Sequence, residues 1–97
     1  MCKQAVIQKA KAILFCGTGV GMAMAANKVE GIRAVCGLDG FSVKFARKYN
    51  DANVLCLGGR VIGPGLAEML IELFLTTEFD GGRHLARVEK LNKVFKS

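Results

Sequence analysis

Residues 12–21 read AILFCGTGVG, an apolar run that stops at a glycine-rich loop. A short apolar run bounded by glycine is typical of a buried strand. The residues after the loop, 22–27, read MAMAAN and favour a helix. A strand that passes through a tight turn into a helix is the repeating unit of parallel sheets. This stretch therefore indicates an α/β protein.

The rest of the chain continues this alternation of strands and helices. Further strands are predicted at 32–36 and 54–57, and further helices at 41–48, 66–75, 83–95 and, before the first strand, 1–10. Pro64 suits the first turn of the helix at 66–75. We expect one domain, 1–97, of the α/β class, with a three-layer α/β/α Rossmann-like arrangement around a parallel sheet.

The helix predicted at 41–48 has two kinds of side chain on different faces. Helical spacing places Phe41, Phe45 and Ala46 on one face. The basic residues Lys44, Arg47 and Lys48 lie off that face.

The composition limits the classes of protein to which the chain can belong. The 97 residues are 52% hydrophobic and 23% charged, which is typical of a globular domain. The longest apolar run is far shorter than the ~20 residues that span a bilayer, and the N-terminus lacks the apolar core of a signal peptide. The net charge of +6 is concentrated at the two ends, without the interleaved aromatic residues of single-stranded nucleic-acid binders. We therefore expect neither a membrane nor a nucleic acid as partner.

The cysteines and the histidine form no metal-site pattern. The four cysteines stand at positions 2, 16, 36 and 56 without a C-x-x-C pair, and His84 is the one histidine. Cys16, Cys36 and Cys56 lie in or at the end of apolar runs, which favours buried, reduced thiols in a cytoplasmic protein. We expect no metal.

The loop at 17–21, with Cys16 before it, is the first candidate site. Backbone N–H groups at the start of a helix attract negative charge, and glycines let a ligand approach the backbone closely. A thiol beside such a helix end can serve as a thiolate base or nucleophile. Two alternatives stay open, because a tight strand–helix turn needs the same glycines and a buried strand end accepts a cysteine.

Three arginines are candidates for binding an anion. Arg60 follows the third predicted strand, at the edge where open α/β sheets bind ligands. Arg83 and Arg87 are four residues apart and share a helix face. Two guanidinium forks at this spacing suit a phosphate or carboxylate, although two solvated arginines on a surface helix would show the same spacing.

Together these stretches resemble the type B ribose-5-phosphate isomerase family and its relatives, the galactose-6-phosphate isomerases. The matching segments follow the family's order and cover essentially the whole chain: ILFCGTGVGM at 13–22, AANK at 25–28, GIRA at 31–34, NDANVL at 50–55, GRVIG at 59–63 and FDGGRHLARV at 79–88. Because several separated motifs agree, the resemblance is highly specific.

The resemblance implies an enzyme of carbohydrate metabolism that interconverts an aldose phosphate and a ketose phosphate without metal or organic cofactor. Ribose 5-phosphate and ribulose 5-phosphate are the expected pair. Cys16 would be the general base that moves a proton from C2 to C1 of the open-chain sugar through an enediolate. The backbone of Gly17, Thr18, Gly19, Val20 and Gly21 would hold the developing oxyanion.

The resemblance also implies substrate-binding residues and a partner. Asn50 falls at a sugar-contacting position, and Arg60, Arg83 and Arg87 fall at substrate-binding positions. In the family two subunits share each site, so a homodimer or homotetramer is implied.

Two features depart from the family pattern. The family has an N-terminal strand with an Asp-His pair that contacts substrate, and residues 1–12 contain no such pair. The chain is therefore expected to be the C-terminal part of the family domain. The family also has a histidine that opens the furanose ring, and this chain has Tyr49 there. Tyrosine donates hydrogen bonds but exchanges its proton slowly near neutrality.

Three hypotheses about function follow. The first is a sugar-phosphate isomerase, or the larger part of one, with Cys16 as base. The second is a non-catalytic remnant that keeps phosphate binding and dimerisation, which Tyr49 and the missing Asp-His pair favour. The third is a basic nucleic-acid-binding module, which charge alone supports.

Overall fold

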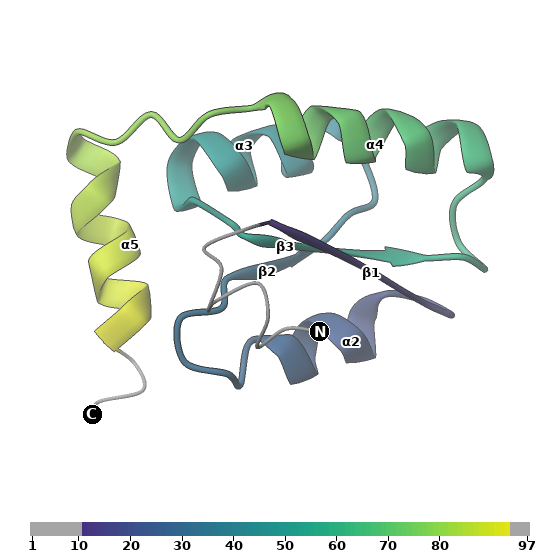
Figure 1. Ribbon diagram of the computed structural model, residues 1–97, viewed down its shortest axis with the longest axis horizontal. Helices are drawn as coiled ribbons and strands as arrows, with labels where there is room; N and C mark the ends of the chain where they lie inside the picture. The colour runs from purple at the N-terminus through teal and green to yellow at the C-terminus, as the bar shows by residue number, and fades with distance from the viewer. Residues whose placement is uncertain (1–10, 94–97) are drawn as a thin grey trace.

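The computed structural model describes residues 11–93 and contains a parallel sheet with helices on both faces (Figure 1). The chain alternates strands and helices and ends on a further helix. In chain order the elements are β1 (Ala12–Cys16), α2 (Val20–Ala26), β2 (Ala34–Cys36), α3 (Gly40–Asn50), β3 (Val54–Gly58), α4 (Pro64–Thr76) and α5 (Arg83–Lys93). The expected helix at 1–10 lies outside the described residues.

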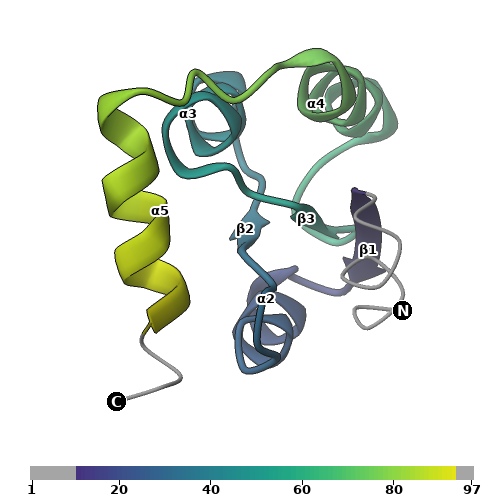
Figure 2. The ribbon, with the colours of Figure 1, turned by 60° about the vertical axis from the view of Figure 1, so that its left-hand side comes forward.

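The three strands are parallel, in the order β1-β3-β2, so the last strand is the central one. Helix α2 covers one face of the sheet, and α3 and α4 cover the other, while α5 lies beyond the β2 edge (Figure 2). This arrangement confirms the predicted three-layer α/β/α fold. It also places the ends of all three strands along one edge of the sheet, because the strands run in the same direction.

The core consists of two clusters, one on each face of β3. All five residues of β3 are buried, which matches its uninterrupted apolar sequence. Leu14 and Val54 pack with Ala26 of α2 on one face. Leu55 and Leu57 pack with Phe74 of α4 on the other. The central strand therefore fixes the positions of the helices on both faces.

Helix α3 buries only part of the apolar face that the sequence indicated. Phe41 is 74% exposed, whereas Val43 and Ala46 are buried and Arg47 is only 5% exposed. Arg47 is buried because its guanidinium group has partners. It donates to the Asp51 carboxylate at 2.8 Å, to the Ala52 carbonyl at 2.7 Å and, from the other side of the group, to the carbonyl of Thr77 at 3.0 Å.

Strand β2 is shorter than the predicted 32–36 because a side chain occupies its first backbone donor. The N–H of Arg33 donates to the Asn53 side-chain oxygen at 2.8 Å, and regular pairing with β3 starts at Ala34. Ile32 still packs in the core below the sheet.

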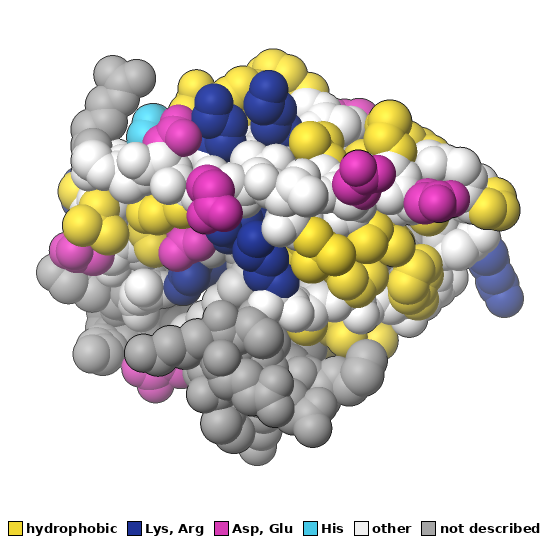
Figure 3. Space-filling model, turned by 45° about the horizontal axis from the view of Figure 1, so that its top comes forward, with side chains coloured by type: hydrophobic (Ala, Val, Ile, Leu, Met, Phe, Trp, Pro, Cys, Tyr) yellow, Lys and Arg dark blue, Asp and Glu magenta, His cyan; other side chains and the backbone are white. Residues whose placement is uncertain are grey.

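The surface carries large hydrophobic side chains on the side of α3 and α4 (Figure 3). Phe41 on α3 is one of them, and Met69 and Leu75 on α4 are about half exposed. No helix within residues 11–93 is both long and apolar enough to cross a membrane.

Candidate active site

Cys16 ends β1 at the edge of the sheet where all the strands end. Its sulfur, half-buried, accepts a hydrogen bond from the N–H of Gly19 at 3.0 Å. Gly19 has a φ of 84°, a backbone conformation that glycine adopts without strain. The loop therefore turns back on the thiol before α2 begins at Val20.

The end of β3 packs directly against this loop. The N–H of Gly59 donates to the Cys16 carbonyl at 2.8 Å, and the N–H of Arg60 donates to the Gly17 carbonyl at 2.9 Å. A Cβ atom at Gly58 would overlap the backbone of Thr18, so the loop closes over the strand only because residue 58 is glycine. These contacts bring Cys16, the loop at 17–19 and the backbone of Arg60 together at one edge.

The side chain of Arg60 is exposed beside the loop. A Cβ atom built on Gly17 would lie 3.7 Å from Cδ of Arg60, so the arginine stem runs along this glycine. A guanidinium group here is available to an anion that approaches Cys16.

The expectation of buried thiols holds for only one of three cysteines. Cys56 in the middle of β3 is 0% exposed. Cys16 and Cys36 are half-buried, and each is the last residue of an outer strand.

The other predicted site residues lie at the opposite edge of the sheet. Tyr49 and Asn50 end α3, just before β3 starts, and Arg83 and Arg87 are on α5. Because a five-residue strand spans ~16 Å, one copy of the chain does not bring these residues to Cys16. The structure thus divides the predicted residues into a Cys16 group and an Asn50 group.

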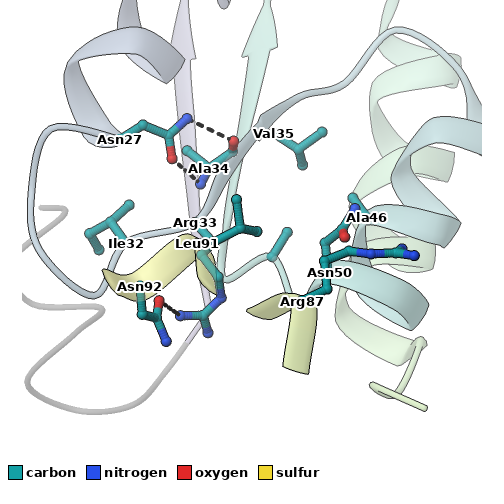
Figure 4. Close-up of a pocket in the computed structure, with 11 residues that line it drawn as sticks. Asn27, Ile32, Arg33, Ala34, Val35, Ala46, Asn50, Arg87, Leu91 and Asn92 are labelled. Atoms are coloured by element: carbon teal, nitrogen blue, oxygen red, sulfur yellow. Dashed lines mark hydrogen bonds between the residues drawn. The ribbon is translucent and has the colours of Figure 1, made fainter. Parts of the chain in front are cut away.

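Two residues of the Asn50 group, Asn50 and Arg87, line a pocket of about 500 Å³ between α5 and the edge of β2 (Figure 4). Asn50 and Arg87 lie on one side of this pocket, and Arg33, whose side chain donates to Asn92 at 3.1 Å, lies on the other. Arg87 is exposed. Polar and basic groups therefore converge on one hollow.

Tyr49 stacks on His84 beside this pocket. The ring centroids are 4.3 Å apart, with 19° between the ring planes. His84 is 8% exposed, and among the described residues its Nδ1 atom has no hydrogen-bond partner. The stack fixes the Tyr49 ring between α5 and Phe45, whose centroid lies 4.7 Å away.

Sequence reasoning missed the charged residues that hold the pocket wall. Asp51 accepts hydrogen bonds from Arg47 at 2.8 Å and from Arg33 at 3.2 Å. Arg33 carries the one charge in the otherwise apolar segment 32–36. A single charged residue in such a segment is the sequence signal that could have identified it.

Lys11 precedes β1 at the same edge of the sheet, and its pKa depends on the groups that surround it there. Burial, and secondarily the positive charge of Arg47, lowers the pKa of Lys11 from its ordinary value, while Glu78 and Asp51 oppose this shift. Basic and acidic side chains therefore both lie near Lys11 at this edge. No group of three or more His, Cys, Asp or Glu side chains that could hold a metal ion occurs among residues 11–93.

Comparisons with known proteins identify a family model and several relatives that match the chain. A sequence model of the Ribose/Galactose Isomerase family matches residues 1–91. Ribose-5-phosphate isomerase B of Escherichia coli is 48% identical over 82 residues, which are 84% of this chain and 55% of that protein. D-erythrulose-4-phosphate isomerase of Pectobacterium atrosepticum is 52% identical over 81 residues, 84% of this chain and 53% of that protein.

The search of solved structures also finds a ribose-5-phosphate isomerase B. Ribose-5-phosphate isomerase B of Clostridium thermocellum superimposes with a TM-score of 0.94 and 41% identity, over 98% of this chain and 65% of that one. The chain spans about half the length of the curated relatives it matches. From its sequence motifs, its fold and these matches, the chain belongs to the ribose/galactose isomerase family.

Proposed function

We propose that the chain catalyses aldose–ketose isomerisation of a sugar phosphate with Cys16 as the general base. The observation that carries the proposal is the position of the Cys16 sulfur at the sheet edge, half-buried and 3.0 Å from a loop N–H. This hydrogen bond fixes the position of the sulfur at the loop, and a cysteine acts as a base through its sulfur. Membership of the isomerase family supports this chemistry.

The reaction moves one proton from C2 to C1 and a second proton from the C2 hydroxyl to the C1 oxygen. In the proposed mechanism the Cys16 thiolate takes the proton from C2 of the open-chain aldose, and the electron pair passes to the carbonyl oxygen as an enediolate forms. A proton passes from the C2 hydroxyl to the C1 oxygen, the Cys16 thiol returns its proton to C1, and the product is the ketose. The backbone of the loop at 17–21 stabilises the negative charge that develops on the C1 oxygen in the transition state and the enediolate.

Two copies of the chain complete the proposed site. Cys16, the loop and Arg60 come from one copy, and Tyr49, Asn50, Arg83 and Arg87 come from the other. The separation of these groups on one copy supports a shared site, as do the exposed hydrophobic side chains of α3 and α4 (Figure 3). We therefore propose a homodimer or homotetramer.

The proposed substrate is ribose 5-phosphate. The paired arginines on α5 suit a phosphate dianion, and relatives in E. coli and C. thermocellum carry the name ribose-5-phosphate isomerase B. The Pectobacterium relative acts on D-erythrulose 4-phosphate, so a four-carbon sugar phosphate is the second substrate to assay. The thiols of Cys16, Cys36 and Cys56 are half-buried or buried, which supports the proposed cytoplasmic location.

A non-catalytic remnant is the second candidate function. Tyr49 favours it, because the phenol is a poor proton donor to a furanose ring oxygen. Such a protein would bind sugar phosphates through the arginines without converting them.

The deciding experiment measures isomerisation of ribose 5-phosphate by the wild-type chain and by Cys16→Ala. We expect activity in the wild type, a loss of at least ~10³-fold in kcat for Cys16→Ala, and nearly unchanged phosphate binding. Met24→Ala, which changes an exposed residue of α2, is the control and keeps full activity. Equal activity in wild type and Cys16→Ala would remove Cys16 as the base. A folded but inactive wild type that binds ribose 5-phosphate would support the remnant.

A further inference from the structure

One peptide bond of the loop contacts two thiols. The N–H of Gly19 donates to the Cys16 sulfur at 3.0 Å. The carbonyl of Thr18, on the other side of the same peptide bond, accepts from the Cys36 thiol at 3.7 Å. Cys16 ends β1 and Cys36 ends β2, so the peptide lies between the ends of the two outer strands.

The surroundings leave this peptide little freedom. A Cβ atom on Gly19 would lie 3.1 Å from the Gly58 nitrogen and 3.2 Å from the Cys36 sulfur. On its other side the Thr18 carbonyl lies directly over Gly58. The end of β3 thus supports the peptide from below, and Cys36 holds its carbonyl end.

We propose that Cys36 is a positioning residue for Cys16, an inference that rests on the proposed function only in treating Cys16 as the base. By donating to the Thr18 carbonyl, Cys36 fixes the direction in which the Gly19 N–H points. A carbonyl that accepts a hydrogen bond also makes the N–H of its own amide a stronger donor. Both effects stabilise the negative charge on the Cys16 sulfur. Cys36 itself touches neither substrate nor reacting atoms in this proposal.

The test follows alkylation of Cys16 by iodoacetamide against pH, with quantification of the tryptic peptide 12–28, which contains no other cysteine. Alkylation requires the thiolate. In Cys36→Ala we expect the midpoint of the profile to move to higher pH by ~0.5 unit or more, because the charged form loses hydrogen-bond support. Cys36→Ser, whose hydroxyl still donates to the Thr18 carbonyl, keeps most of the wild-type profile.

Val35→Ala is the matched control for lost packing. Val35 precedes Cys36 on β2 but packs with the cluster on the opposite face of the sheet. This variant lowers stability without moving the Cys16 profile. A Cys36→Ala profile that coincides with wild type, or a Val35→Ala shift of equal size, would overturn the positioning role.

The outcome is independent of the proposed isomerase activity. Alkylation reports the state of the Cys16 thiol whether or not a sugar is converted. A chain that fails the isomerase assay but shows the shifted profile keeps the positioning role, and a chain that passes the assay with an unshifted profile loses it.

Discussion

At the scale of single residues, Arg87 is the exposed group best placed to bind phosphate on α5. It lines the pocket with Asn50 and Arg33, and the guanidinium of Arg33 is already occupied by Asp51 and Asn92. Arg87 is therefore the arginine of this pocket that an incoming anion can use. The proposed role is binding rather than proton transfer.

Replacing Arg87 by methionine removes the charge but keeps a long side chain. We expect KM for ribose 5-phosphate to rise about 10- to 100-fold with a small change in kcat, since one charge-assisted hydrogen bond is lost. Steady-state kinetics measure this effect, with unphosphorylated ribose as a second substrate whose conversion does not change. Lys90→Met, an exposed lysine on the same helix, is the control. An equal rise in KM for Lys90→Met would mean that overall charge, not a phosphate contact, is responsible.

The sequence shows which residue types matter but not which of them meet. Cys16 and Arg60 could be placed at the same sheet edge because each follows a strand, and the structure confirms that placement. Tyr49 stacks on His84, and the two residues are far apart in the sequence. No local sequence pattern could therefore predict this contact. The burial of Arg47 likewise depends on a carbonyl 30 positions away, that of Thr77. Helical periodicity reports hydrophobicity and does not detect such a partner.

At the scale of elements, local signals located β1 better than the starts of β2, α2 and α4. Strand β1 spans the predicted residues, because an apolar run that stops at glycine is a local feature. Helix α2 starts at Val20 and α4 starts at Pro64, each two residues before its prediction. Their first turns are set by the loops that precede them, and loop conformation depends on contacts with β3.

The pair Gly58 and Gly59 tests how the strand end supports the loop. Neither glycine has a positive φ, so an alanine at each position differs mainly in space. A Cβ at Gly58 overlaps the Thr18 backbone, whereas a Cβ at Gly59 meets only the Cys16 carbonyl oxygen at 3.8 Å. We expect Gly58→Ala to lower the free energy of unfolding by ~2–4 kcal/mol, because backbone must shift to make room.

Urea denaturation at equilibrium measures this difference. The matched variant Gly59→Ala changes the free energy of unfolding by less than ~0.5 kcal/mol. If the two alanine variants were equally stable, the loop would not rest on Gly58, and the support that β3 gives to the Thr18–Gly19 peptide would have to be discarded.

At the scale of the whole molecule, the parallel sheet explains why one copy holds two half-sites. Residues that follow strands collect at one edge, and residues that precede strands collect at the other. Cys16 and Arg60 belong to the first set, and Asn50 belongs to the second, close to α5 (Figure 1). Two copies related by a two-fold axis can place the first edge of each against the second edge of the other.

Mixing Cys16→Ala with Arg87→Met, at a substrate concentration where each alone is nearly inactive, tests this arrangement. In a dimer of Cys16→Ala with Arg87→Met, one site contains both altered residues and the other contains neither. Equal amounts of the two variants, unfolded together and refolded, should therefore recover about a quarter of the wild-type activity for a two-fold dimer. Activity is measured on the refolded mixture, and native mass spectrometry of the same sample gives the fraction of mixed dimers. Each variant refolded alone is the control and stays nearly inactive at a substrate concentration well below the KM of Arg87→Met. If mixed dimers form and activity does not return, Cys16 and Arg87 act within one copy, and the shared site is wrong.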